Sequence, residues 1–87
     1  MTSNELRVLV DYYVKYEHTT YEEAVSLSIA DILDYINTDM SILQLCRKQW
    51  YNRKIAGTLT DEFTAICKEL ADICKHSISA RKQLLQV

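Results

Sequence analysis

Hydrophobic residues recur at spacings of three and four along most of the chain, which is the pattern of amphipathic helices. The pattern is clearest near the C-terminus, where one stripe comprises Phe63, Ile66, Cys67, Leu70, Ile73, Cys74 and Ile78. Arg81 falls on the same stripe, and we expect this charge to end it. Four blocks share the pattern, and we predict helices over residues 3–17, 20–36, 40–56 and 60–78, followed by a frayed tail, 79–87.

Signals for helix ends accompany these blocks. Thr20 stands three residues before a glutamate, the spacing of a capping box, and should open the second helix. The polar residues 37–39 predict a turn, with Asp39 as the next N-cap. Gly57, the single glycine, suits a left-handed C-cap, and Thr60 suits the last N-cap. Such short connections predict a small up-down four-helix bundle.

Composition supports an all-α fold in one domain, residues 1–87. The chain has one glycine and no proline, whereas a sheet protein of this length needs several turns built from those residues. Hydrophobic residues make up 48% of it and the net charge is −2, which predicts a folded chain. No apolar run approaches the roughly 20 residues of a membrane span, and the start lacks a signal-peptide pattern. We therefore expect a cytoplasmic protein without membrane insertion.

The cysteines Cys46, Cys67 and Cys74 are predicted to be reduced thiols in the core. Cys67 and Cys74 lie two helical turns apart, about 10 Å along the axis, which is too far for them to share one zinc ion. The sequence offers no recognisable pair of nucleophile and base, and no glycine-rich phosphate loop. We expect neither catalysis nor a metal or cofactor, which leaves a binding protein.

Two surfaces are candidates for a protein interface. The first predicted helix carries apolar and aromatic residues beyond its core stripe, at Val8, Tyr12 and Tyr16, and tyrosine is favoured in interfaces. The second predicted helix has an acidic outer face around one leucine, formed by Glu23, Leu27, Asp31 and Asp34. Its inward stripe comprises Tyr21, Val25, Ile29, Ile32, Leu33 and Ile36. Both surfaces also fit ordinary solvated helix faces.

Bases interleave with aromatic residues in the third predicted helix. Nucleic-acid contacts there would come from Arg47, Lys48, Tyr51, Asn52 and Lys54. The cations would neutralise phosphates while the asparagine reads a base edge. Around a single helix, however, these cations do not form one stripe, and the net charge of the chain is negative. Nucleic acid is therefore the weaker alternative to a solvated or internally paired basic helix.

The sequence thus predicts a non-enzymatic helical module that binds another protein and acts by occupying a macromolecular surface, as inhibitors, immunity proteins, antitoxins and phage antagonists do. In form it is loosely similar to four-helix bacteriocin immunity proteins, through four short helices and a last helix with the generic pattern Thr60, Ile66, Leu70 and Ile73. Two alternatives stay open. One is a dimeric DNA-associated regulator using the third predicted helix, and the other is a self-associating structural subunit, such as a homodimer.

Overall fold

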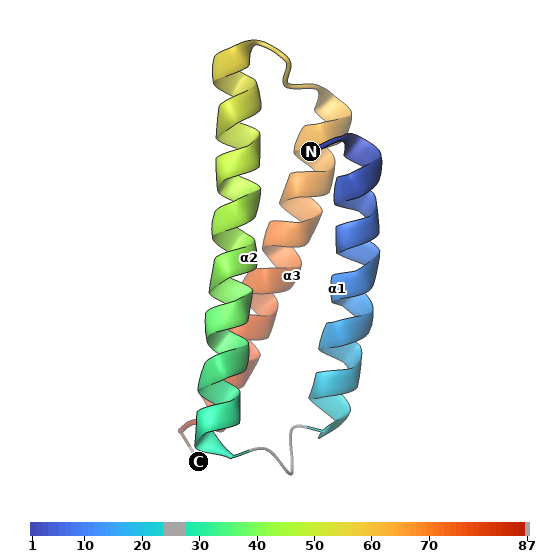
Figure 1. Cartoon of the computed structure of the whole chain (residues 1–87). Helices are drawn as coiled ribbons and strands as arrows, with labels where there is room; N and C mark the ends of the chain where they lie inside the picture. Colours follow the sequence, from blue (N-terminus) through green and yellow to red (C-terminus); the bar gives the residue numbers. More distant parts are fainter. Residues whose placement is uncertain (24–27, 87) are drawn as a thin grey trace.

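Uninterrupted helix-forming sequence gives this protein long helices. The computed structural model describes residues 1–23 and 28–86, with the backbone alone for 17–23. Three α-helices follow one another in the described chain: α1 (Ser3–Glu23), α2 (Ile29–Ala56) and α3 (Asp61–Leu84). They run down, up and down in an elongated molecule of 46 × 20 × 15 Å (Figure 1). The all-α prediction is confirmed, but the four-helix bundle is wrong, because the described residues form three helices.

The boundary between the first two helices differs from the prediction. α1 continues through Thr20 to Glu23, because neither glycine nor proline interrupts the sequence there. α2 begins after Ser28, whose hydroxyl accepts a hydrogen bond from the Asp31 N–H at 3.2 Å. The Asp31 carboxylate in turn accepts one from the Ser28 N–H at 3.3 Å. This reciprocal capping box, rather than Thr20, fixes the start of α2.

α2 is continuous through residues 37–39, where the sequence predicts a turn. Asp39, expected as an N-cap, is fully buried in the interior of this helix. Its Oδ2 atom accepts hydrogen bonds from Ser77 Oγ at 2.6 Å and from Arg81 Nη1 at 3.0 Å, both on α3. Two hydrogen bonds from another helix to Oδ2 keep α2 intact where the local composition favours a turn, while Asp39 Oδ1 is buried without a hydrogen-bond partner in the described structure.

Arg81 belongs to the buried interface of α2 and α3 rather than to a frayed tail. α3 extends to Leu84, so the predicted helix end at residue 78 and the predicted tail from residue 79 are wrong. The Arg81 side chain is 7% exposed, and its guanidinium lies 5.3 Å from the centre of the Tyr35 ring. Arg81 therefore continues the buried stripe of α3 instead of ending it, because its charge is paired with Asp39 inside the fold.

The connection between α2 and α3 agrees with the sequence. Gly57 has a φ of 72°, and its N–H donates to the Lys54 carbonyl at 3.2 Å as a left-handed C-cap. Thr60 Oγ1 accepts a hydrogen bond from the Phe63 N–H at 3.1 Å and caps α3. Both predicted caps are confirmed, and the short connection makes α2 and α3 antiparallel neighbours.

Replacing Gly57 by alanine is expected to lower the free energy of unfolding by about 1 kcal/mol, because L-residues other than glycine are disfavoured at this positive φ. A Cβ added here meets no described atom within 4 Å, so the cost is conformational rather than steric. Urea denaturation measures the change, with Thr58→Ala in the same loop as the neutral control. An unchanged midpoint for Gly57→Ala would contradict the left-handed cap.

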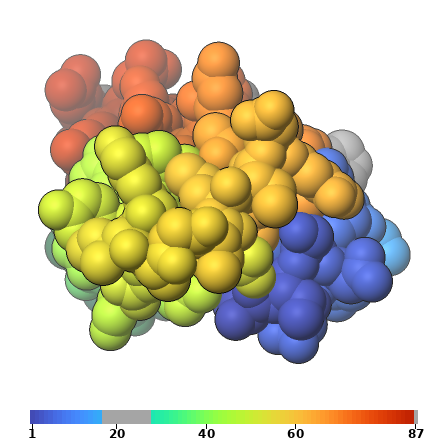
Figure 2. Space-filling model, turned by 90° about the horizontal axis from the view of Figure 1, so that it is seen from above, coloured from blue at the N-terminus to red at the C-terminus, as the bar shows by residue number. Residues whose placement is uncertain are grey.

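α3 is the central element of the fold, since α1 and α2 pack on two of its flanks. The core cluster comprises Leu6, Val10 and Tyr13 of α1, Cys46 of α2, and Phe63, Ile66, Cys67, Leu70 and Cys74 of α3. Figure 2 shows, from above, the end of α2 and the start of α3 against the N-terminal end of α1. A salt bridge from Arg7 to Glu69 at 2.8 Å ties α1 to α3, and the Arg53 guanidinium donates to the Met1 carbonyl.

Candidate functional site

A groove of about 470 Å³ lies between α2 and α3. One row of residues on each helix lines it: Cys46, Arg47, Trp50 and Tyr51 of α2, and Thr64, Cys67, Lys68, Ala71 and Lys75 of α3. α1 is bound to a different flank of α3, the one that carries Glu69, about 150° around the helix from Ala71 and its row. The groove is therefore accessible to a ligand while α1 stays in place.

Trp50 forms a wall of this groove in a fixed orientation. Its indole Nε1 donates a hydrogen bond across the groove to Thr64 Oγ1 at 3.2 Å. The Lys54 ammonium nitrogen lies 4.9 Å from the centre of the Trp50 ring, within the range of a cation–π contact. Because these contacts engage its polar edge and its π-system, Trp50 contributes a rigid and mainly apolar surface.

The groove is basic although the chain as a whole carries a net charge of −2. Arg47, Lys68 and Lys75 are exposed and line it, and Lys54 stands beside Trp50. The described lining residues include no acid that would neutralise them. A concave surface with one sign of charge concentrates ligands of the opposite sign, so the groove favours a negatively charged partner.

The floor of the groove is apolar, because the thiols of Cys46 and Cys67 form part of it. Both cysteines and Cys74 are buried and none of them forms a disulfide, which confirms the predicted core thiols. Burial raises the pKa of Cys46 to about 11, helped by the neighbouring Cys67, whose own pKa burial also raises. Thiols that stay protonated at neutral pH are weak nucleophiles, so these side chains act here as small hydrophobic groups.

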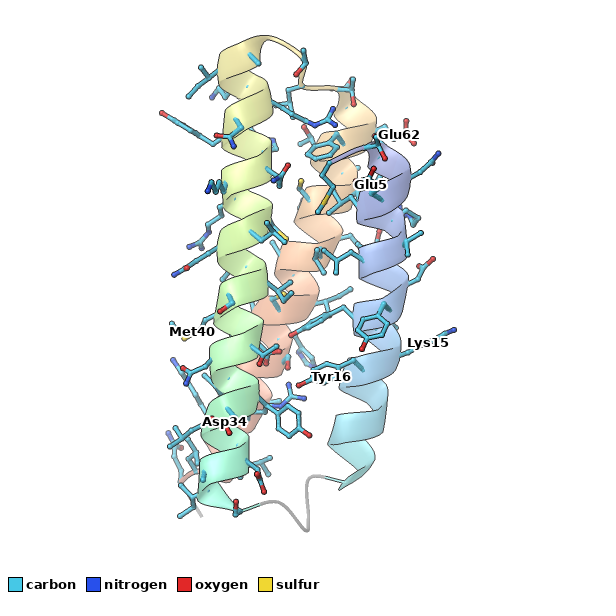
Figure 3. All side chains as sticks on the ribbon, viewed as in Figure 1. Glu5, Lys15, Tyr16, Asp34, Met40 and Glu62 are labelled. Carbon is cyan, nitrogen blue, oxygen red and sulfur yellow. The ribbon has the colours of Figure 1, made fainter. Side chains whose placement is uncertain are left out.

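An exposed apolar row extends the groove along α2. Ile29 and Leu33, which the sequence predicts to face the core, are 69% and 46% exposed, and Met40 is 44% exposed. These three residues lie within about 40° of Arg47 around the helix axis. Figure 3 shows Met40 on the side of α2 that points away from α1. A fourth helix would cover this row, whereas the three described helices leave it open.

The residues proposed for nucleic-acid contact are divided between two flanks of α2. Arg47 and Tyr51 line the groove, and Lys54 adjoins it through Trp50. Lys48 and Asn52 are exposed about 100° further around the helix, outside the groove. The predicted set therefore does not form one contact surface, although its members nearest the groove do.

Two cations of the groove, Lys68 and Lys75, are absent from the residues predicted from the sequence. Their spacing of seven residues places them on one flank of α3, with Ala71 between them. That spacing is visible in the sequence, but its significance depends on the packing of α3 against α2. The groove is thus a property of two helices, and a search along single helices misses half of its rim.

The tyrosine edge predicted on α1 is only partly exposed. Val8 and Tyr12 are 67% and 68% exposed. Tyr16 is half-buried, with its ring centre 5.7 Å from that of Tyr13 and 5.6 Å from that of Tyr35 on α2. Figure 3 shows Tyr16 pointing from α1 toward α2. Tyr16 therefore contributes to the contact between these helices, while Val8 and Tyr12 remain candidates for contact with a partner protein.

The acidic face predicted on the second helix is incompletely described. Asp31 takes part in the capping box of α2. Asp34 is exposed, and Figure 3 labels it on α2 near the lower end of that helix. Glu23 ends α1 instead of lying on α2, so the predicted grouping on one helix is wrong in this respect. The side chain of Glu23, together with the whole of Leu27, lies outside the described residues. The use of this face as an interface stays a prediction.

The described part of the chain offers no comparable metal site or membrane-spanning helix. These residues include no group of three or more His, Cys, Asp or Glu that could hold a metal ion. No described helix is long and apolar enough to cross a membrane. No family model, curated protein or solved structure matches the chain. The case for a function therefore depends on the groove itself.

Proposed function

We propose that this protein is a non-enzymatic module that binds another protein by holding a segment of it in the groove between α2 and α3. The observation that carries the proposal is an apolar floor inside a basic rim, without an acid among the described lining residues. Concave, mainly apolar sites with a few polar groups are typical of binding sites. Tryptophan, tyrosine and arginine, which all line the groove, are the residue types that dominate binding energy at protein interfaces.

A partner segment that combines apolar side chains with carboxylates matches both parts of the groove. Its apolar groups would bury surface against Cys46, Cys67 and Ala71, at about 25 cal/mol for each Å² removed from water. Its carboxylates would approach Arg47 and the lysines of the rim, which guides association and orients the segment. By covering part of the partner's surface, the protein would act as an inhibitor or antagonist. Its place in the cytoplasm is a prediction from the sequence.

Ala71→Arg is expected to weaken partner capture strongly, because it places a long charged side chain in the groove from a half-buried position. Tagged protein is incubated with nuclease-treated host lysate, and bound proteins are quantified by mass spectrometry. Recovery of the stoichiometric partner should fall at least about tenfold, as for the loss of a central interface contact. Lys48→Ala and Asn52→Ala, on the outer flank of α2, are the matched controls and should retain it.

Capture that survives Ala71→Arg would contradict the groove as the binding site. Equal loss with Lys48→Ala would contradict it too, since that residue lies on another flank. Far-UV circular dichroism of each variant shows that the helices are intact.

Nucleic-acid binding is a second candidate, favoured by the gathering of Arg47, Lys54, Lys68 and Lys75 at one groove. Base stacking there is limited, because Lys54 already contacts the Trp50 ring. This function requires an affinity for nucleic acid that falls steeply as the salt concentration rises. The slope of log affinity against log salt should become about one unit shallower for each phosphate-contacting cation removed. A partner that resists nuclease favours the protein-binding function instead.

A further inference from the structure

The groove offers no backbone hydrogen bonds to a bound segment. Its walls belong to the interiors of α2 and α3, where N–H and C=O groups bond within their own helix. An extended segment laid there would remove its amides from water without new partners, which costs free energy. A helical segment satisfies its own backbone, and its side-chain ridges fit the groove between two other helices.

Two rows of side chains with a seven-residue repeat flank the groove and its extension. They are Leu33, Met40 and Arg47 on α2 and Lys68, Lys75 and Lys82 on α3. A seven-residue repeat is characteristic of helices that pack side by side at an angle of about 20°. The repeat therefore fits a helix as the occupant.

The register of α2 and α3 sets these rows opposite each other. The Trp50–Thr64 and Asp39–Ser77 hydrogen bonds, at 3.2 and 2.6 Å, fix the alignment of the two antiparallel helices. Counting along both helices from these bonds brings each member of the α2 row level with a lysine of the α3 row, in reverse order. One flank is thus apolar over most of its length, and the other is basic.

We infer that the occupant is an amphipathic helix of another protein, which lies along α2 and α3 as a fourth helix and carries acidic residues at every seventh position on the flank that faces α3. This inference rests on the proposed protein-binding function and names the class of partner. Each lysine of the α3 row receives one carboxylate, and the exposed Leu33 and Met40 receive apolar side chains. From Ile29 to Tyr51 the contact spans about 33 Å, the length of a helix of some six turns.

The test compares two synthetic peptides of about three heptads that share an apolar seam and differ in one flank, glutamate in the first and lysine in the second. Calorimetry with the full chain at low salt measures affinity and stoichiometry. The glutamate peptide is expected to bind one to one and at least about tenfold more tightly than the lysine peptide, from three exposed ion pairs together.

Charge reversal on the protein supplies the matching control. A variant with Lys68→Glu, Lys75→Glu and Lys82→Glu is expected to prefer the lysine peptide, because the flank then has the opposite sign. These side chains are exposed, so the fold should persist, and Lys75→Glu alone should give an intermediate preference. Lys48→Glu, on the outer flank of α2, changes the net charge by the same amount as Lys75→Glu alone and should leave the preference for the glutamate peptide intact.

Four outcomes would overturn the inference. Unchanged binding of a glutamate peptide with a central proline, which breaks a helix, would make the occupant an extended segment and leave the proposed function standing. Equal affinity for both peptides would show that the lysine row of α3 does not select an acidic flank on the partner helix. A native dimer that excludes the peptides would make the occupant a second copy of this chain. Failure of both peptides, with partner capture insensitive to Ala71→Arg, would overturn the proposed function as well.

Discussion

Arg81→Met is expected to lower the free energy of unfolding by about 3–5 kcal/mol, because it leaves the Asp39 carboxylate buried without its counter-charge. The side chains of this pair are 7% and 0% exposed, and Arg81 Nη1 lies 3.0 Å from Asp39 Oδ2. Ser77 would still donate to the same oxygen, but a hydroxyl carries no charge. Urea denaturation near pH 7 measures the loss.

The loss should shrink as the pH falls. Burial raises the pKa of Asp39 above its ordinary value, against the opposing effects of Ser77 and Arg81. Removing Arg81 raises the folded-state pKa further above that of the unfolded chain. The folded variant then gains stability relative to the parent as the pH drops through the raised pKa, since its buried carboxyl becomes neutral. A loss that grows toward acid pH would contradict this reasoning.

Arg7→Met is the matched control for Arg81→Met. It removes the exposed ion pair with Glu69, whose side chains are about half exposed, and should cost less than about 1 kcal/mol. If both variants lose the same stability, the Asp39–Arg81 pair is not buried as described.

Thr38→Pro is expected to lower the free energy of unfolding by at least about 3 kcal/mol, because residue 38 lies in the interior of α2. Proline there removes the N–H that bonds the Asp34 carbonyl and crowds that oxygen. Thr38→Ala removes the hydroxyl, which donates to the same carbonyl at 3.0 Å, and the γ-methyl of an exposed side chain, and should change stability by less than about 0.5 kcal/mol. A proline variant as stable as its parent would restore the turn at residues 37–39 and the four-helix interpretation.

Residue type and position suffice to predict helix ends that depend on near neighbours. Gly57 and Thr60 act as caps through backbone groups within a few residues, so their roles can be recognised in the sequence. The predicted turn fails because Asp39 binds Ser77 and Arg81, which follow it by 38 and 42 residues. A tertiary contact of this kind overrides local preference and leaves no local signal.

The candidate site is predictable from the sequence only in part, for the same reason. Arg47, Tyr51 and Lys54 stand out because bases and aromatics alternate on one helix. Lys68 and Lys75 become part of the site only because α3 packs beside α2, which places both lysines at the groove. An amphipathic pattern also shows which residues are apolar, but not how wide a stripe the neighbouring helices will cover.

The buried pair between α2 and α3 has a consequence for binding thermodynamics. A slip of one helix along the other by a single turn, about 5.4 Å, would separate Asp39 from Arg81 and leave the Asp39 carboxylate buried without this counter-charge. The spacing and register of the groove walls are therefore set before a ligand arrives. Such preorganisation places most of the entropic cost of association on the partner, so the entropy of binding should depend mainly on how well the partner segment is ordered in isolation.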